Sequence, residues 1–261
     1  MDSIFQHFRK EEQQFIEQVS GWMNEVEDRY TPKLTDFLDP RERFIVQSVL
    51  GANDIQMASL GLFPDAERQR VLLYPSYYEP TAADFQIQVF ELKYPVKFVT
   101  LRHPDILGSL MSVGLDRSKF GDIRIDGERI QFAVADEVSL YLKTNFVSAA
   151  KVKVQLLEVE DVAEMITATE EWHEESHTVS SMRLDAVISS VYNISRQKAS
   201  ALIHGGKVKV NWTAQEQPSF ELHESDMISS RGFGRIKVLM VEGRTKKDKV
   251  RLQIGRLEQR K

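Results

Sequence analysis

The sequence contains no cysteine among its 261 residues, and this absence excludes several chemistries at once. Disulfides, zinc–thiolate sites and cysteine nucleophiles are all ruled out. Long apolar runs are missing too: no stretch approaches the roughly 18 apolar residues of a membrane span, and residues 1–10 lack the apolar core of a signal peptide. We therefore expect a cytoplasmic protein without membrane contact.

Motifs for common catalytic chemistry are equally scarce. The sequence has no phosphate-binding loop of the NTPase type and no readable spacing for a Ser-His-Asp triad. His173-Glu174-Glu175-Ser176-His177 does match the H-E-x-x-H pattern of zinc proteases. Zinc-protease helices are buried by apolar neighbours, whereas this stretch is acidic, so we favour a solvated linker here. We expect no enzyme, no cofactor and no bound metal.

The net charge of -5 hides an asymmetry along the chain. Residues 179–261 carry 16 Lys and Arg against 8 Asp and Glu, whereas residues 1–178 carry 18 against 31. A basic C-terminal third on an acidic body points to a polyanion bound by that third. Charge alone does not distinguish nucleic-acid binding from an uneven surface.

Residues 1–83 predict a mainly helical N-terminal region of an α+β protein. Apolar residues from Phe5 to Met23 recur at helical spacing, and Asp39-Pro40 has the cap and first-turn proline of a second helix that Gly51 ends. Two short strands are expected after it, at residues 55–60 and 71–74.

Residues 84–160 predict a ferredoxin-like, RRM-like middle domain. The expected order is a strand at 96–101, a helix from His103, strands at 123–125 and 130–134 around an Asp-Gly turn, a helix capped by Asp136, and a strand at 151–157. This β-α-β-β-α-β order occurs in many RNA-binding modules and in unrelated proteins. The third strand lacks the aromatic pair and glycines of the usual RNA-recognition strand, so the sequence leaves RNA contact by this domain open.

Residues 161–179 are expected to be an acidic linker, either a solvated helix or an extended segment. Eight carboxylates crowd into and just before this stretch: Glu158, Glu160, Asp161, Glu164, Glu170, Glu171, Glu174 and Glu175.

Residues 180–261 predict a compact basic domain. Leu184, Val187, Ile188 and Val191 form one apolar stripe of a first helix. Ser195 is expected to cap a second helix that Gly205-Gly206 ends. Strands follow, with the lysines of Lys207–Asn211 opposite its valines, and a glycine-rich turn at Arg231–Arg235. Basic residues from Lys246 to Lys261 form a tail region, in which residues 249–254 alternate well enough to be a strand.

We expect one basic groove where the second helix begins beside the lysine strand and the arginine turn. Helix N-terminal amides and basic side chains both suit phosphates. The RNA-binding candidates are Arg183, Ser195, Arg196, Lys198, Lys207, Lys209, Arg231, Gly232, Gly234 and Arg235. Ser195 would position the helix, and the two glycines would permit the turn. Trp172 and Trp212 are candidates for base stacking, although tryptophan more often packs.

Residues 181–244 resemble the alpha-L RNA-binding domain, named after small-subunit ribosomal protein four. The matching residues are Arg183-Leu184-Asp185, Ser195-Arg196-x-x-Ala199, Leu202-Ile203-x-x-Gly206-x-Val208-x-Val210-Asn211, Asp226-x-Ile228-Ser229 and Arg231-Gly232-x-Gly234-Arg235. The whole chain is similar to the bacterial YlmH family, whose middle domain resembles the stretch HPDILGSLMSVGLDRSKFGDI at 103–123. The resemblance implies binding to rRNA and tRNA on the large ribosomal subunit, at obstructed subunits in ribosome-associated quality control.

Two other classes of function stay open on the sequence. Arg183-Leu184-Asp185 also resembles the catalytic motif of pseudouridine synthases, but only about 75 residues follow it, too few for a synthase domain. An RNA-modifying enzyme or zinc hydrolase is one alternative, and an adaptor whose basic face meets an acidic protein is the other. We expect the protein to be a monomer.

Overall fold

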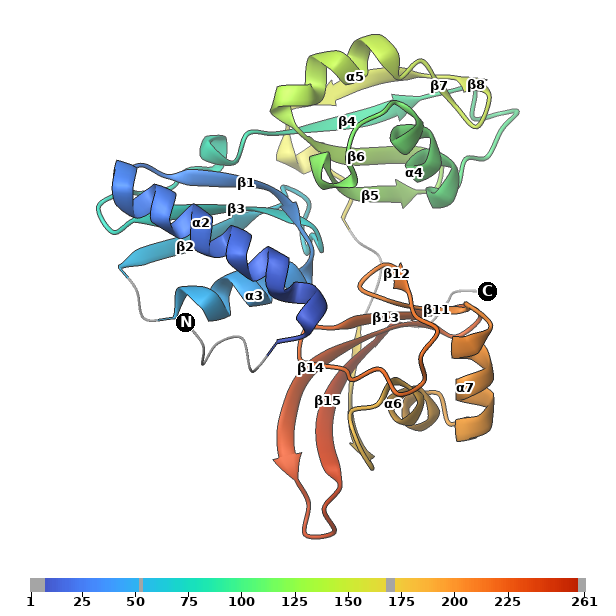
Figure 1. The fold of residues 1–261 in the computed structure, drawn as a ribbon. Coiled ribbons are helices and arrows are strands. Elements are labelled where there is room, and N and C mark those ends of the chain that lie inside the picture. Colours follow the sequence, from blue (N-terminus) through green and yellow to red (C-terminus); the bar gives the residue numbers. More distant parts are fainter. Residues whose placement is uncertain (1–7, 52–53, 168–171, 258–261) are drawn as a thin grey trace. The chain divides into compact units, whose positions relative to one another are not determined.

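The computed structural model describes residues 8–51, 54–167 and 172–257, which fold as two compact units with their boundary between residues 168 and 169. The mixture of helices and sheets confirms the α+β class (Figure 1). Among the described residues, none of the helices has both the length and the apolar character needed to cross a membrane.

The first unit begins with a helical layer on a small sheet. Helices α2 and α3 cover strands β1, β2 and β3, which are antiparallel in the order β1-β3-β2 (Figure 1). Strand β2 lies at the expected residues, and β1 is a strand that the sequence did not predict. The elements are η1 (Lys10–Glu12), α2 (Gln13–Arg29), β1 (Lys33–Leu38), α3 (Pro40–Leu50), β2 (Ile55–Leu60) and β3 (Gln69–Pro75).

The same unit continues with the expected β-α-β-β-α-β order. Its antiparallel sheet has the strand order β5-β6-β4-β9, so the first and third strands of the motif lie in the centre. The elements are η2 (Ala82–Phe85), β4 (Ile87–Lys93), α4 (His103–Ser112), η3 (Arg117–Lys119), β5 (Phe120–Asp126), β6 (Arg129–Ala135), η4 (Asp136–Val138), α5 (Ser139–Asn145), β7 (Ser148–Ala149), β8 (Val152–Lys153), β9 (Gln155–Val159) and η5 (Val162–Glu164).

The predicted first strand at 96–101 is wrong, because the strand is Ile87–Lys93. Residues 96–98 form a turn and residues 99–101 an irregular segment instead: the Val96 amide donates to the Tyr94 carbonyl and the Phe98 amide donates to the Pro95 carbonyl, at 2.9 and 3.0 Å. Apolar β-branched residues suggested a strand there, but these local bonds occupy the backbone groups that a strand would pair. The predicted closing strand at 151–157 is divided between β8 and β9.

Both faces of the middle-domain sheet are covered. Phe90 and Phe132 point to one face, where they pack with residues of α4 and α5. Val89 and Ala133 point to the other face, and they are buried against Phe37 of the N-terminal region. The face that an RNA-recognition domain uses for stacking bases is therefore filled by the chain's own N-terminal region.

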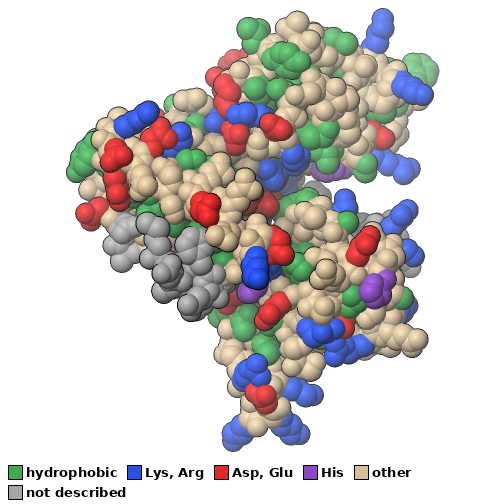
Figure 2. All heavy atoms as spheres, viewed as in Figure 1, with side chains coloured by type: hydrophobic (Ala, Val, Ile, Leu, Met, Phe, Trp, Pro, Cys, Tyr) green, Lys and Arg blue, Asp and Glu red, His purple; other side chains and the backbone are tan. Residues whose placement is uncertain are grey.

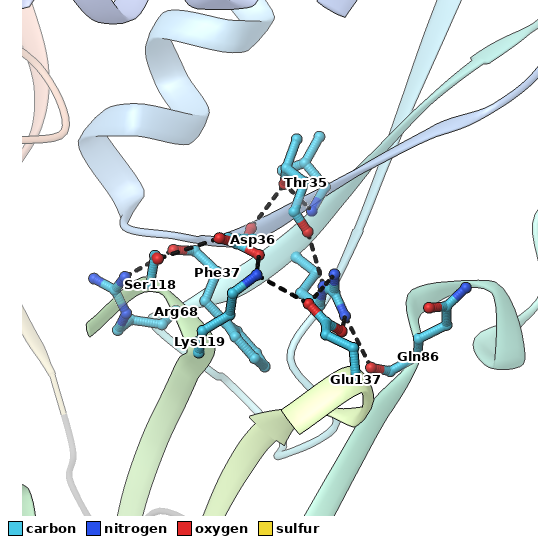
Figure 3. A network of polar contacts seen from close by, with 10 residues as sticks. Thr35, Asp36, Phe37, Arg68, Gln86, Ser118, Lys119 and Glu137 are labelled. Atoms are coloured by element: carbon cyan, nitrogen blue, oxygen red, sulfur yellow. Dashed lines mark hydrogen bonds and ion pairs between the residues drawn. The ribbon is translucent and has the colours of Figure 1, made fainter. Parts of the chain in front are cut away.

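A polar network with two buried arginines joins the N-terminal sheet to the middle domain (Figure 3). Arg68 donates from Nη2 to the Phe37 carbonyl at 2.7 Å and from Nε to the Phe120 carbonyl at 3.1 Å. Arg70 donates to the carbonyls of Thr35 and Gln86 at 2.8 and 2.9 Å, and it pairs with Glu137 at 3.0 Å. Lys119 bridges Asp36 to the same Glu137, at 2.6 and 3.1 Å.

The second unit has two helices on one face of a six-stranded antiparallel sheet. Its strand order is β10-β15-β14-β13-β11-β12, and its core comes from α6, α7 and the inward side chains of the central strands. The elements are β10 (His173–Val179), α6 (Leu184–Val191), α7 (Arg196–His204), β11 (Val208–Val210), β12 (Thr213–Ala214), β13 (Met227–Ser230), β14 (Gly234–Arg244) and β15 (Val250–Leu257). The predicted strand at 249–254 is confirmed as part of β15.

The linker interpretation is wrong for residues 173–179, which form edge strand β10 against β15. Alternate residues Glu175, His177 and Val179 point to the side of the helices, as in a strand with one buried face. The strand was not predicted because the many carboxylates nearby are typical of a solvated linker. On a strand, His173 and His177 are set roughly 13 Å apart, too far for one zinc ion to join them. His177 instead contacts Ser190 and Glu175, at 3.3 and 2.9 Å.

The first turn of α3 contains a buried capping box. Asp39 accepts from the Glu42 amide at 2.8 Å, and Glu42 accepts from the Asp39 amide at 2.7 Å. Burial, and then the neighbouring Asp39 carboxylate, raise the pKa of Glu42 from 4.5 to about 7. The fold therefore favours the protonated form of Glu42.

We expect Glu42→Gln to stabilise the protein above pH 7. The folded pKa of Glu42 exceeds its ordinary value, so wild-type stability falls as pH rises from 4.5 to about 7. Glutamine keeps the acceptor oxygen and cannot ionise, which should add about 1–3 kcal/mol at pH 8 and little at pH 4.5. Chemical denaturation at both pH values measures this, and a gain that does not depend on pH would contradict it.

We expect Arg68→Met to lower the free energy of unfolding by about 2–4 kcal/mol, because two buried carbonyls lose their donor. Arg29→Met is the matched control, since the Arg29 side chain is 71% exposed on α2. Urea denaturation of the full chain compares the two variants. Equal loss in both would show that the Arg68 contacts contribute nothing beyond an ordinary surface arginine.

Candidate RNA interface

Asp185 holds two of the predicted arginines in place. Its carboxylate is 5% exposed near the start of α6, and it accepts from Arg183 at 3.1 Å and from Arg196 at 2.7 Å. Burial raises the pKa of Asp185, but the hydrogen bonds from the two arginines outweigh burial and hold it below its usual range. The Arg183 and Arg196 side chains remain 42% and 50% exposed, so each presents its outer edge to solvent.

The start of α7 is built as expected. Ser195 caps the helix by accepting from the Lys198 amide at 3.1 Å. Arg196 and Lys198 are exposed on the first turn, beside amides that have no partner within the helix. Positive side chains and helix-end dipoles here attract the same anionic ligand.

The glycine-rich turn between β13 and β14 lies next to α7. The Arg231 amide donates to the Lys207 carbonyl at 2.9 Å. Phe233 packs on Tyr192 with ring centroids 5.0 Å apart, and the Lys198 ammonium lies 5.7 Å from the Phe233 ring. The Lys198 ammonium therefore lies beside this turn, which contains Arg231 and is bonded to the main chain of Lys207.

Gly232 and Gly234 both have positive φ, of 87° and 99°. Such backbone is costly for residues with a Cβ, so both glycines are needed for the shape of the turn. Their predicted role in permitting the turn agrees with this conformation.

Lys209 and Arg235 lie on the other face of the sheet. Val208 and Val210 are buried under the helices, so the side chain of Lys209 between them points away. Lys209 pairs with Ser229, which pairs with Arg235, so these three share the outer face. The expected single groove is thus divided: most candidates gather around α7 and the turn, and two lie on the outer face.

Lys237, two residues after Arg235 on the same outer face, is a further cation that was not among the predicted candidates. The alternation of Lys237 with Ile236 and Val238 was a usable signal. Trp172 packs on this face, with the Arg235 guanidinium 5.5 Å from its ring, whereas Trp212 is 38% exposed in the turn after β11. One face of the Trp172 ring is therefore covered by the Arg235 guanidinium, which is typical of a packing residue.

The middle domain offers no comparable sheet surface. Gln131 of β6 is fully buried, and its amide accepts from Ile166 and donates to the Glu164 carbonyl, at 2.8 and 3.0 Å. Residues after η5 thus cover the part of the sheet that the N-terminal region leaves. The candidate interface accordingly lies in the second unit, which holds the ten predicted residues.

Comparisons with known proteins identify RNA-binding families in both units. Family models match residues 11–78 ("YlmH, N-terminal"), 80–163 ("Putative RNA-binding domain in YlmH") and 182–228 ("S4 domain"). The chain is 42% identical to ribosome-associated protein quality control protein P2 of Bacillus subtilis, over 98% of this chain and 99% of that protein. It is also similar to a solved structure, cell division protein ylmH from Streptococcus pneumoniae. That match has 32% identity and a TM-score of 0.54, over 61% of this chain and 98% of the other. The chain belongs to the YlmH family, and its second unit contains an S4 domain.

Proposed function

We propose that this protein binds structured RNA through its S4 domain and associates with the large ribosomal subunit. The expected ligands are rRNA and tRNA on obstructed subunits, in ribosome-associated quality control. The relative at 42% identity supports this, because its name describes a ribosome-associated quality control protein. We also propose that the protein acts in the cytoplasm as a monomer.

The observation that carries the proposal is the cluster around Asp185 and the α7 N-terminus. Two half-exposed guanidinium groups are held at one carboxylate, beside a capped helix start with Lys198 and a turn that contains Arg231. Fixed guanidinium groups suit phosphate oxygens, because their donors lie in a plane and form paired bonds. Because Asp185 fixes the positions of both arginines, this cluster differs from a surface that is merely rich in basic residues.

The same geometry argues against a catalytic role for Asp185. A catalytic aspartate needs an open carboxylate within reach of substrate. Asp185 is buried, and both of its oxygens accept from arginines. We therefore propose that Asp185 positions the arginines, and that the protein is an RNA-binding protein without its own RNA-modifying activity.

We expect Arg196→Gln/Arg231→Gln to weaken binding to tRNA at least tenfold at about 150 mM salt, because two phosphate contacts are lost. The slope of log affinity against log salt should fall by roughly 0.7–0.9 for each contact. Filter binding over a salt series measures both quantities. Lys10→Gln/Arg29→Gln, which removes two exposed cations from the first unit, should bind like wild type. Equal affinity of the two double variants would remove the support for this interface.

In cells, crosslinking and sequencing of bound RNA tests the ribosomal part of the proposal. Enrichment of large-subunit rRNA and tRNA, lost in Arg196→Glu/Arg231→Glu, is the expected result. Crosslinks that persist in this variant would move the RNA site elsewhere on the chain. Partner binding that survives nuclease treatment, without RNA crosslinks, would favour a protein adaptor.

We expect Asp185→Asn to reduce selectivity rather than overall attraction for RNA. The substitution removes one negative charge, which favours any polyanion, but it releases Arg183 and Arg196 from fixed positions. The ratio of the dissociation constants for poly(U) and tRNA should therefore fall several-fold. Parallel titrations with the two RNAs give this ratio, and a ratio equal to that of wild type would mean that Asp185 has no positioning role.

A further inference from the structure

The second unit carries a basic feature that lies outside the interface described above. Strands β14 and β15 continue past the end of β13, which pairs only with residues 234–237 of β14 (Figure 1). Strand β10 lies along the other side of β15 as far as Val250, so the turn at residues 245–249 projects beyond the paired strands. We call residues 242–251, with the turn that joins the two strands, the basic arm. The predicted basic tail is thus partly a folded hairpin.

The turn of the basic arm is held by its own hydrogen bonds. The Thr245 amide donates to the Lys249 carbonyl at 2.7 Å, and the Asp248 amide donates to the Thr245 carbonyl at 2.9 Å. The Thr245 hydroxyl accepts from the Lys249 amide at 3.2 Å. Side chains on this turn therefore project from a defined backbone.

Charge at the arm is strongly one-sided. The two acidic residues are paired with its two arginines, Asp248 with Arg244 at 2.7 Å and Glu242 with Arg251 at 3.8 Å. Lys246, Lys247 and Lys249 are exposed, and none of the three forms an ion pair with another described residue. Figure 2 shows blue side chains gathered at this end of the hairpin.

The arm and the arginine turn stand at opposite ends of β14. Arg235 lies at the start of the strand and Arg244 at its end, which corresponds to roughly 30 Å at 3.3 Å per residue. A short single-stranded segment bound at one end does not reach the other. An A-form RNA duplex of about a dozen or more base pairs does, because it is a rigid rod whose backbone runs the whole length.

We propose that the basic arm binds the phosphate backbone of the same RNA duplex that the S4 interface holds. Three lysines on one turn, with both neighbouring acids already paired, suit phosphates, and the arm presents no apolar surface at its tip for a protein partner. The arm acts as a second contact that selects RNA by duplex length. This inference rests on the proposed RNA binding by the S4 domain.

The test compares two hairpin RNAs, with stems of 6 and 24 base pairs, in titrations with the full chain. Lys246→Gln/Lys247→Gln/Lys249→Gln should lose about tenfold in affinity for the long stem, with a salt slope lower by about 2–3. It should bind the short stem like wild type. Lys246→Arg/Lys247→Arg/Lys249→Arg should retain wild-type affinity for both.

The matched control, Lys93→Gln/Lys97→Gln/Lys153→Gln, removes three exposed lysines of the first unit. Wild-type affinity of the arm variant for the long stem overturns the inference, as does an equal loss in the control. Equal loss on both stems overturns the shared-duplex geometry. If Arg196→Gln/Arg231→Gln loses affinity while the arm variant does not, only the arm inference fails. If wild type binds neither RNA, the proposed function fails as well.

Discussion

The burial of Arg68 and Arg70 between the N-terminal sheet and the middle domain is the constraint on which the first unit depends. A guanidinium group removed from water is tolerated only when its donors find acceptors. Here the acceptors are mainly main-chain carbonyls from β1, β5 and Gln86, the residue directly before β4, so several strand positions are fixed together. The N-terminal sheet and the middle domain are consequently joined by directional hydrogen bonds as well as by apolar contact.

This junction covers the sheet face that a ferredoxin-like domain usually leaves open. Its fold usually leaves one sheet face open for aromatic stacking on bases. In this chain Phe37 and Phe63 fill that face, and Arg68 and Arg70 seal its edge. The likeness to RNA-recognition domains is therefore one of strand order and not of an open base-stacking face.

Sequence reasoning succeeded where one local rule determined the outcome. Ser195 and Asp39 cap their helices, Gly232 and Gly234 take positive φ, and the stripe from Leu184 to Val191 is buried. These features depend on residues within a few positions of one another, so a short stretch of sequence is enough to predict each of them.

Sequence reasoning failed where the structure depends on contacts between residues far apart in the chain. Residues 96–101 have strand propensity, but the residues that pair in the sheet are 87–93. Strand β10 looked like a linker because its partner lies far along the chain. The role of Asp185 and the division of the basic candidates between two faces depended on α7 folding back onto α6.

The pairing of β10 with β15 also has a consequence for synthesis. His173 pairs with Arg256 and Val179 with Val250, so closing this edge joins positions 71 to 83 residues apart. Such non-local pairing is slow relative to the local contacts of α6 and α7. During translation the helices and the inner strands are free to assemble before β10 finds its partner strand. Until then β10 is an unpaired strand, and charges such as the Glu174 and Glu175 carboxylates discourage its pairing with a strand of another nascent chain.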